Sequence, residues 1–357
     1  MAAATQSSEP TTSNVSAANP DPTPVVNSQR VWTTLITNLD YLPGLLTLSH
    51  SLRASHTAYP LLALYTSTFP ASGLRALHAR GIPTKEIPYL LPSAPKDFAN
   101  DPRFYDCWSK LTPFGLVEYE RVVQLDSDML VLRNMDELME LELDGPELGG
   151  TGTRVFAACH ACVCNPLSKP HYPADWIPAN CAHTTLHATP TTACETAPPP
   201  TAGLGMPNGG LQVVNPSRQT YERITTSLSS PASTASYEFA DQSLLSDLFP
   251  GRWVALPYVY NALKTMRRQG VHDVIWRDDE VRNVHYILSP KPWDEVDKDD
   301  ASKATGASEE EAHPGSQLAP ASAQPPAESG DGTHRWWWAM NRDRKRVERE
   351  QGIEDDF

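Results

Sequence analysis

Two acidic residues one position apart, Asp126 and Asp128, follow an apolar run in the segment R-V-V-Q-L-D-S-D. The apolar residues predict a short buried strand, and in open α/β sheets ligands bind just beyond the carboxyl ends of such strands. With only Ser127 between them, both carboxylates can converge on one hard divalent cation, which prefers oxygen ligands and leaves sites for phosphate oxygens. Such a pair also occurs in solvated turns, so it indicates a metal-bridged nucleotide only if other features agree.

A second group of residues with metal-binding chemistry lies further along the chain. Four cysteines and three histidines crowd together there: Cys159, Cys162, Cys164, Cys181, His160, His171 and His183. Thiolates and imidazoles suit tetrahedral zinc, so a zinc site is one interpretation. The spacing differs from the standard zinc-finger patterns, and buried thiols are common in protein cores, so both interpretations stay open.

Composition limits the classes to which the chain can belong. At 357 residues with 40% apolar content, it is long enough for a large α/β domain with polar extensions. Acidic residues number 43 against 29 basic ones, a net charge of −14, which argues against nucleic acid or an anionic membrane as a partner. Because the sequence has neither a membrane-length apolar run nor a signal peptide pattern, we expect a cytoplasmic protein whose six cysteines remain thiols.

Strand and helix patterns alternate on both sides of the acidic pair. Before it, apolar runs predict strands at 31–38, 60–66 and 82–88, and helical periodicity predicts helices at 42–55 and 72–81. After it, we expect a short helix at 134–141, strands at 155–158 and 210–216, and helices at 217–228 and 241–248. This alternation predicts right-handed βαβ units and an α/β fold with a Rossmann-like, mainly parallel sheet flanked by helices.

The same patterns divide the chain into segments. Residues 1–30 are predicted to be a disordered tail, and 31–295 the folded domain, with a Cys- and Pro-rich insertion at 159–207. Residues 296–334 have the composition of an acidic low-complexity linker, and 335–357 that of a tryptophan-rich helix that docks on the domain. This tail is also a surface through which a homodimer could form.

Five segments, in chain order, resemble the glycogenin-like glycosyltransferases of family 8, over a stretch from about Trp32 to Trp293. They are T-L-I-T-N-L-D-Y-L-P-G, D-S-D at Asp126, N-G-G at Asn208, D-Q at Asp241 and H-Y-I-L-S-P-K-P-W at His285. The resemblance implies a GT-A type fold and transfer of a hexose from a UDP-sugar to a hydroxyl acceptor, with retention of anomeric configuration. It also implies a divalent cation held by Asp126, Asp128 and His285. A neutral imidazole beside two carboxylates suits Mn²⁺ better than Mg²⁺.

The resemblance also assigns roles to individual residues. Those implied to bind the nucleotide-sugar are Leu35, Thr37, Asn38, Tyr41, Lys110, Asp126, Ser127, Asp128, Gly209 and Lys291. Lys291 would reach the diphosphate as a compact cation. Asp241 is the candidate carboxylate facing the oxocarbenium-like sugar, with Gln242 and Asn208 orienting sugar hydroxyls and Glu238 as a second candidate acid. Asp241 is also well placed to cap the helix that follows it.

Two positions depart from the family pattern. Leu288 stands where these enzymes have a glycine close to phosphate, and a positive φ would be costly for leucine. Gly209 stands where serine is more frequent, so a hydroxyl contact is lost while Asn208 is kept.

Two other functions compete with the transferase. A haloacid-dehalogenase-type phosphatase also has a strand that ends in D-x-D, and W-R-D-D at 276–279 could supply its late acidic pair. Leu130 is unsuited to that family, which also leaves N-G-G and the His285 motif unexplained. The second alternative is a relative that binds a nucleotide-sugar without turning it over. The donor sugar, the acceptor (protein tyrosine, polyol or glycan) and the retaining mechanism, covalent or same-face, stay open at this level.

Overall fold

The computed structural model describes residues 24–94, 98, 102, 104–295, 332–355 and 357. Most of the tail predicted at 1–30 and of the linker predicted at 296–334 therefore lies outside the described residues. Within the described part of the chain, every helix is too short or too polar to cross a lipid bilayer.

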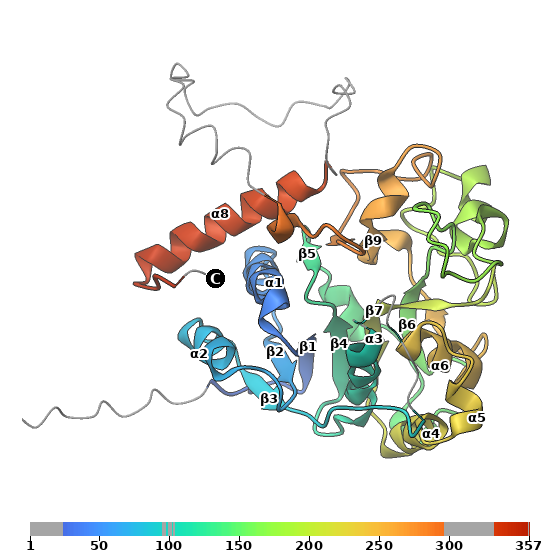
Figure 1. The fold of residues 1–357 in the computed structure, drawn as a ribbon, viewed down its shortest axis with the longest axis horizontal. Coiled ribbons are helices and arrows are strands. Elements are labelled where there is room, and N and C mark those ends of the chain that lie inside the picture. The colour runs from blue at the N-terminus through green and yellow to red at the C-terminus, as the bar shows by residue number, and fades with distance from the viewer. Residues whose placement is uncertain (1–23, 95–97, 99–101, 103, 296–331, 356) are drawn as a thin grey trace, which may run out of the picture.

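A seven-stranded sheet with the order β3-β2-β1-β4-β7-β6-β8 forms the centre of the molecule (Figure 1). Its strands are β1 (Arg30–Ile36), β2 (Leu61–Tyr65), β3 (Thr84–Glu86), β4 (Arg121–Leu125), β6 (Phe156–His160), β7 (Pro207–Val214) and β8 (Val254–Ala255). Strands β1 to β4 pair in parallel, β6 pairs in parallel with β8, and β7 runs antiparallel to both β4 and β6. The predicted mainly parallel α/β sheet is confirmed.

Helices cover both faces of this sheet. They are α1 (Leu42–Ala54), α2 (Ala71–Ala79), α3 (Phe104–Cys107), α4 (Arg218–Leu228), α5 (Pro231–Thr234), α6 (Ala240–Leu248) and α8 (His334–Glu350). Local sequence explains their ends: the Ser217 hydroxyl accepts a hydrogen bond from the backbone of Thr220 at the start of α4, and α2 is followed by Gly81 with φ +66°. The short helix predicted at 134–141 is instead a 3₁₀ helix, η3 (Asp136–Glu140).

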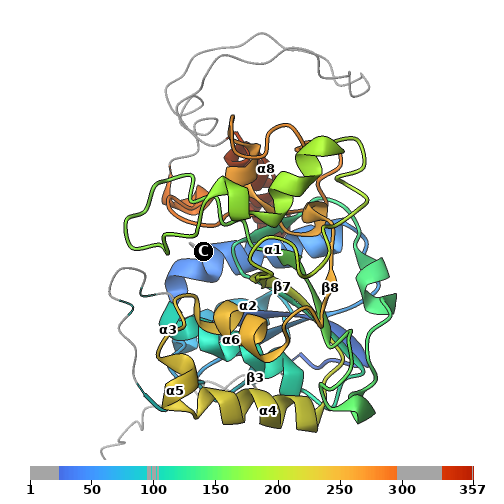
Figure 2. The same ribbon diagram turned by 90° about the vertical axis from the view of Figure 1, so that its right-hand side faces the viewer.

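Alternating side chains on the strands build two cores. Val123 in β4 packs with Leu48 and Leu52 of α1, whereas Val214 in β7 packs on the opposite face with Ile224 of α4 and Phe156 of β6. Because successive side chains of a strand point to opposite faces, both faces of this sheet carry apolar side chains, and each face needs a layer of helices to cover them. Figure 2 shows α1 on one side of the strands and α4 on the other.

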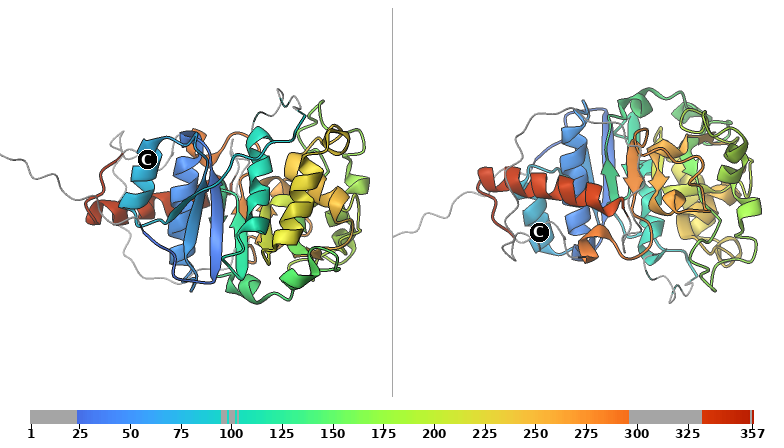
Figure 3. Two further views of the ribbon diagram at one scale, coloured as in Figure 1. Left: turned by 90° about the horizontal axis from the view of Figure 1, so that it is seen from below. Right: turned by 90° about the horizontal axis from the view of Figure 1, so that it is seen from above.

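The C-terminal helix α8 lies across the outer side of α1 (Figure 3). The Thr47 hydroxyl donates a 3.1 Å hydrogen bond to the side chain of Asn341, and Trp337 is 1% exposed in the core beneath the helix. At the far end of the helix, Arg80, which follows α2, contacts the buried carboxylate of Glu348. Trp337 is therefore used inside the chain and is not available to a dimer interface.

A small three-stranded sheet joins distant parts of the chain. It consists of β5 (Met129–Val131), β10 (Asn283–His285) and β9 (Ala262–Leu263), in the order β5-β10-β9. His285 is paired with Met129 across the antiparallel β10 and β5 strands, and the Tyr286 backbone donates a 2.9 Å hydrogen bond to the carbonyl of Asp128. The pairing places His285 beside the segment Asp126–Asp128, called the acidic motif below.

The insertion predicted at 159–207 leaves the sheet after β6 and returns at β7. Between these strands it forms the 3₁₀ helices η5 (Pro178–Asn180) and η6 (Ala182–Ala188). Because β6 pairs with β7, the insertion begins and ends on neighbouring strands. Strand β7 carries Gly210, whose carbonyl accepts a hydrogen bond from the Asp126 backbone, so the end of the insertion lies close to the acidic motif.

Candidate active site

Three strand ends meet at the acidic motif. Strand β1 pairs in parallel with β4, with Thr34 opposite Leu125, so the segment after β1 lies beside Asp126. The antiparallel strand β7 begins at the same end, where the Asp126 backbone donates a 2.8 Å hydrogen bond to the carbonyl of Gly210. Most of the residues that the sequence analysis selected line one cavity, whereas Gly209, Asp241 and Lys291 do not line it. Lining it are Leu35, Thr37, Asn38, Tyr41, Lys110, Asp126, Ser127, Asp128, Asn208, Gln242 and His285.

Asp126, Asp128 and His285 bring one ligand atom each within 4.8 Å of one another. The His285 Nε2 atom is 3.2 Å from Asp128 Oδ1 and 3.6 Å from Asp126 Oδ2. Asp128 and His285 are buried, and Asp126 is partly exposed toward the cavity. Two carboxylate oxygens and one imidazole nitrogen, with one side open, form a donor set that fits a divalent cation such as Mn²⁺.

Asn261, which the sequence analysis did not select, orients this imidazole. Its Oδ1 atom is 2.9 Å from His285 Nδ1, and its Nδ2 group donates a 2.8 Å hydrogen bond to Asn208 Oδ1. With the proton on Nδ1, the Nε2 lone pair of His285 points to the carboxylates, the arrangement that metal-binding histidines generally have. Asn208 Oδ1 also accepts from the Gly210 backbone at 3.0 Å, so this oxygen is used in positioning.

Two glycines are required by close approaches at the site. A Cβ on Gly210 would lie 2.4 Å from Cε1 of His285, and a Cβ on Gly44 would lie 2.4 Å from the carbonyl oxygen of Ser127. Contacts this short cannot be accommodated without moving one partner. Glycine therefore lets β7 approach His285 and lets α1 approach the acidic motif.

Lys291 contacts the second oxygen of Asp128. Its ammonium group donates hydrogen bonds to Asp128 Oδ2 at 2.5 Å and to the Tyr286 carbonyl at 2.7 Å. Burial by itself would raise the pKa of Asp128, but the charges of Lys291 and His285 and their hydrogen bonds outweigh it and hold that pKa well below its ordinary value. Asp128 is therefore ionised and ready to bind a cation.

Lys110 connects the acidic motif to Asp241. Its ammonium nitrogen is 3.1 Å from Asp126 Oδ2 and 3.9 Å from Asp241 Oδ2. Burial alone would lower the pKa of Lys110, but the two carboxylates raise it well above its ordinary value, so the side chain is a buried cation. The resemblance implies that Lys110 contacts the nucleotide-sugar, and the structure places Lys110 in the cavity lining, between Asp126 and Asp241.

Asp241 is 1% exposed, and burial raises its pKa to about 6, with Lys110 acting in the opposite direction. It does not cap α6, as the sequence had suggested, because the helix begins at Ala240 and the N-cap residue is Phe239. Within the first turn its carboxylate lies 3.4 Å from the side-chain nitrogen of Gln212. A Cβ on Gly209 would lie 2.1 Å from Asp241 Oδ2, so the glycine at this position leaves space for the acid.

The neighbouring Gln242 accepts a 2.9 Å hydrogen bond from the Gly209 backbone through Oε1 and lines the cavity. Glu238 is not brought into the site. It lies in the bend before α6, is exposed and is not among the residues that line the cavity.

The loop after β1 forms the far wall of the cavity. Asn38 caps the short 3₁₀ helix η1 (Leu39–Tyr41) by accepting a 3.1 Å hydrogen bond from the Asp40 backbone. The Thr37 hydroxyl donates a 2.7 Å hydrogen bond to Asp106, a cavity-lining acid that the sequence analysis missed because no motif surrounds it. The Tyr41 ring lies 5.6 Å below the Lys291 ammonium, within cation–π distance.

Leu288 lies close to this wall with a φ of +63°. Leucine thus adopts the left-handed conformation that the sequence analysis considered costly, and its side chain lines the cavity. A leucine in this region costs about 1–2 kcal/mol relative to glycine, which the packing of the loop must offset.

Aromatic residues of the insertion complete the cavity. Trp176 is stacked on Phe239, with ring centroids 4.1 Å apart, and Tyr172 packs edge-on against Trp176 at 5.0 Å. Both insertion residues line the cavity together with Phe104. Neither was selected from the sequence, because an aromatic residue in an irregular segment has no local signal of function.

Comparison with solved structures identifies the fold. The glycosyltransferase GlyE from Streptococcus pneumoniae TIGR4 superposes with a TM-score of 0.50 at 15% identity, over 92% of this chain and 64% of that chain. The match thus spans less than two thirds of that structure and shows the fold alone. The mixed, mainly parallel sheet with its flanking helices is therefore a GT-A type fold.

The particular family follows from the sequence comparison. Residues 33–297 match Glycosyl transferase family 8, and the chain belongs to this family. Galactinol synthase 1 of Arabidopsis thaliana is 29% identical over 300 residues, which cover 79% of this chain and 76% of the relative. UDP-glucuronate:xylan alpha-glucuronosyltransferase 2 of the same plant is 27% identical over 73% of this chain but only 35% of its own length. The predicted family membership and the glycosyltransferase class are confirmed.

The phosphatase alternative is wrong. Family membership contradicts it, and none of the four W-R-D-D residues lines the cavity of the acidic motif; in that segment Asp278 forms an ion pair with Arg267 at 2.8 Å. A late acidic pair is therefore not present beside Asp126 and Asp128, whose neighbouring groups are His285, Lys110 and Lys291.

Proposed function

We propose that this enzyme transfers a hexose from a UDP-sugar to a small polyhydroxy acceptor, with retention of anomeric configuration and dependence on Mn²⁺. The observation that carries the proposal is the convergence of Asp126, Asp128 and His285 within 4.8 Å at the cavity that also contains Lys110, Gln242 and the loop after β1. Four carboxylates (Asp106, Asp126, Asp128 and Asp241) and two lysines at the site leave a net negative charge, which suits one bound divalent cation.

Asp126, Asp128 and His285 would hold the cation, which when bound would neutralise the charge that develops on the departing UDP. Lys291 would contribute a second positive charge to the diphosphate, since its ammonium group already lies at the acidic motif. Thr37, Asn38 and Tyr41 would hold the uracil and ribose, because they line the cavity beyond the end of β1, where open α/β sheets bind nucleotides.

Asp241 would face the reacting sugar. A buried carboxylate stabilises positive charge that develops on the sugar as the bond to the leaving group breaks. Lys110 would offset the repulsion between Asp241 and Asp126 and contact the donor, while Gln242 and Asn208 would hold sugar hydroxyls.

The acceptor would lie against the aromatic wall of Tyr172 and Trp176. Flat aromatic surfaces pack well against the apolar faces of sugar and cyclitol rings. Relatives whose names state that they synthesise galactinol support a small polyhydroxy acceptor rather than a protein side chain. The aromatic residues come from the insertion, so acceptor choice would depend on this segment.

The test measures UDP release by the purified full chain with a panel of UDP-hexoses, with and without Mn²⁺ and with myo-inositol as the first acceptor. We expect release with at least one donor, stimulation by the acceptor, and an α-linked product by NMR when the donor is α-linked. Asp128→Asn should lower turnover by at least about 100-fold, because it removes a charged ligand of the cation. Asp279→Asn is the matched control, since this exposed acid lies outside the site, and it should keep full activity.

Two results would contradict the proposal. Tight Mn²⁺-dependent binding of UDP-sugars without any release of UDP would make the chain a non-catalytic binder. Equal turnover in Asp128→Asn and in the unchanged chain would show that the acidic motif does not serve the reaction.

A further inference from the structure

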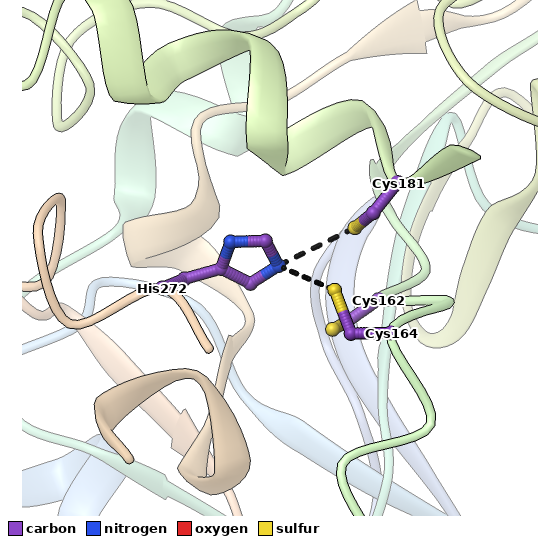
Figure 4. Close-up of side chains that lie close together, drawn as sticks. All are labelled: Cys162, Cys164, Cys181 and His272. Carbon is purple, nitrogen blue, oxygen red and sulfur yellow. Dashed lines mark hydrogen bonds between the residues drawn. The ribbon is translucent and has the colours of Figure 1, made fainter. Parts of the chain in front are cut away.

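A cluster of three thiols and one imidazole lies at the start of the insertion, and one of its members, Cys162, also lines the cavity that contains the acidic motif. Cys162, Cys164, Cys181 and His272 bring their Sγ and ring nitrogen atoms within 4.8 Å of one another (Figure 4). His272 Nε2 is 3.3 Å from Cys164 Sγ and 3.3 Å from Cys181 Sγ. All six cysteines of the chain lie in the described residues, and none forms a disulfide.

Three separate segments contribute to this cluster. Cys162 and Cys164 follow β6 as a C-x-C pair, Cys181 immediately precedes η6, and His272 is 91 residues further along, after the 3₁₀ helix η8 (Lys264–Arg267). A C-x-C pair places both thiols on the same side of an extended segment, as Figure 4 shows for the two sulfur atoms. Their convergence is thus a product of the tertiary fold.

The distances fit tetrahedral zinc. With Zn–S bonds of about 2.3 Å and Zn–N bonds of about 2.0 Å, the ligand atoms of a tetrahedral site lie about 3.5–3.8 Å apart. The two sulfur–nitrogen distances of 3.3 Å therefore need only small adjustments. Three thiolates and one imidazole are soft and intermediate ligands, which select zinc over the Mn²⁺ expected at Asp126 and Asp128.

The surroundings of His272 favour the same assignment. The ring is fully buried, and its Nδ1 atom lies 2.9 Å from Nε2 of His187. If Nδ1–H donates to His187, the Nε2 lone pair is directed at the sulfurs, as in metal sites whose histidine is oriented by an outer hydrogen bond.

The other residues of the sequence cluster are used elsewhere. The Cys159 thiol contacts the Pro257 carbonyl at 3.2 Å, and His160 and His183 interact with backbone carbonyls through Nε2. The set that the sequence suggested is therefore corrected to three of its cysteines plus His272.

We propose that Cys162, Cys164, Cys181 and His272 bind one structural Zn²⁺ ion. Four protein ligands fill a tetrahedral shell and leave no position for substrate, so this ion would have no direct part in the reaction. It would fasten the insertion to the segment between η8 and β10. The insertion supplies Tyr172 and Trp176 to the cavity, and β10 supplies His285, so the zinc would fix the two walls of the site relative to each other.

The first experiment measures zinc in the full chain purified from zinc-supplemented cells without a metal-affinity tag. We expect about one zinc per chain, and less than about a tenth of that in Cys164→Ser or His272→Ala. The control is Cys194→Ser, because this thiol lies in the same insertion but contacts the hydroxyl of Tyr258 at 3.4 Å, and it should keep its zinc. Asp128→Asn should also keep it, which separates this ion from one at the acidic motif.

Two further measurements do not depend on whether a ligand variant folds. Replacing zinc by Co²⁺ in the unchanged chain should give thiolate-to-cobalt charge-transfer absorption and intense tetrahedral ligand-field bands, which the oxygen-rich acidic site cannot produce. His187→Ala leaves all four ligands in place and should weaken zinc binding by about 10–100-fold in competition with a chelator, with partial rescue in His187→Gln.

Three results would overturn the proposal: a zinc-free chain that does not take up zinc or Co²⁺, zinc that is lost from Asp128→Asn but kept in Cys164→Ser, or a disulfide among these cysteines in the protein purified under reducing conditions. None of these measurements requires turnover. The zinc site and the proposed transferase activity can therefore fail independently.

Discussion

Asn261 Oδ1 lies 2.9 Å from His285 Nδ1, and this contact fixes which nitrogen of the imidazole faces the two aspartates. Asn261 is itself held by Asn208, so the N-G-G segment and the candidate cation ligand His285 belong to one hydrogen-bond chain. An outer residue of this kind typically changes metal affinity by 10–100-fold when it is removed.

We therefore predict that Asn261→Ala weakens Mn²⁺ binding by about 10–100-fold, because the imidazole loses the partner that fixes its tautomer and ring angle. Isothermal titration with Mn²⁺ in the presence of UDP would measure the change. Turnover should recover partly at high Mn²⁺, which would not happen if Asn261 only stabilised the fold. An unchanged Mn²⁺ affinity would disprove the orienting role.

Asp241 should make the metal-free enzyme less stable at neutral pH than at acidic pH. Its pKa in the folded chain is about 6, above the ordinary value of 3.8, so the folded state binds this proton more tightly than the unfolded state. The contribution to stability is present below pH 3.8 and is lost as the pH rises to about 6. A shift of about two pH units corresponds to about 3 kcal/mol at pH 7.5.

Replacing Asp241 by its neutral isostere asparagine tests whether the ionised carboxylate destabilises the folded chain at neutral pH. Asp241→Asn should raise the free energy of unfolding at pH 7.5 by about 1–3 kcal/mol and change it little at pH 4, while abolishing most of the turnover. Urea unfolding in EDTA would measure both values. Asp278→Asn is the control, and it should lower the free energy of unfolding at pH 7.5. The reason is that the ion pair with Arg267 lowers the pKa of Asp278 against the effect of burial. Loss of stability in Asp241→Asn at pH 7.5 would contradict the prediction.

Gly210→Ala should displace His285. The added Cβ would lie 2.4 Å from Cε1 and 2.7 Å from Nδ1 of the ring, so either β7 or the imidazole must move. We expect at least about a tenfold loss of Mn²⁺ affinity, comparable to the loss of an orienting partner. Gly332→Ala is the control, because its Cβ would meet only the mobile end of Arg267 at 3.0 Å. Equal Mn²⁺ affinities in the two variants would show that the ring tolerates the methyl group.

Trp337→Ala should destabilise the loop that carries Lys291. The indole of Trp337 is 1% exposed and packs against Trp293 with ring centroids 5.5 Å apart. Removing a fully buried tryptophan costs about 3–5 kcal/mol, or roughly 5–10 °C in Tm for a domain of this size. Thermal unfolding would measure this loss, and KM for the UDP-sugar should rise as the loop loosens. Trp336→Ala should have a smaller effect, since that side chain is only partly buried.

Much of the fold could be predicted because its determinants are local. The apolar runs that end at Ile36 and Leu125 have strand character by themselves, and the helix periodicity of 42–54 follows from neighbouring residues. The position of Leu288 was also recognised as unusual, and its φ of +63° bears this out. By contrast, the position of Glu238 outside the cavity was not predicted, because the conformation of the bend before α6 depends on the segments that this bend packs against.

The amino-acid sequence by itself determined that Asp126 and Asp128 follow a buried strand in a mainly parallel α/β sheet, because period and polarity along a few residues are enough to specify that environment. Only the tertiary structure decided that His285, which the family resemblance had named, lies beside both acids, that Asn261 contacts its ring, and that His272, rather than His160 or His183, joins the thiols. The contacts of His285 with Asp128 and of His272 with Cys181 join residues 91 or more positions apart. Their geometry is set by the pairing of β10 with β5 and by the path of the insertion, which no local pattern encodes.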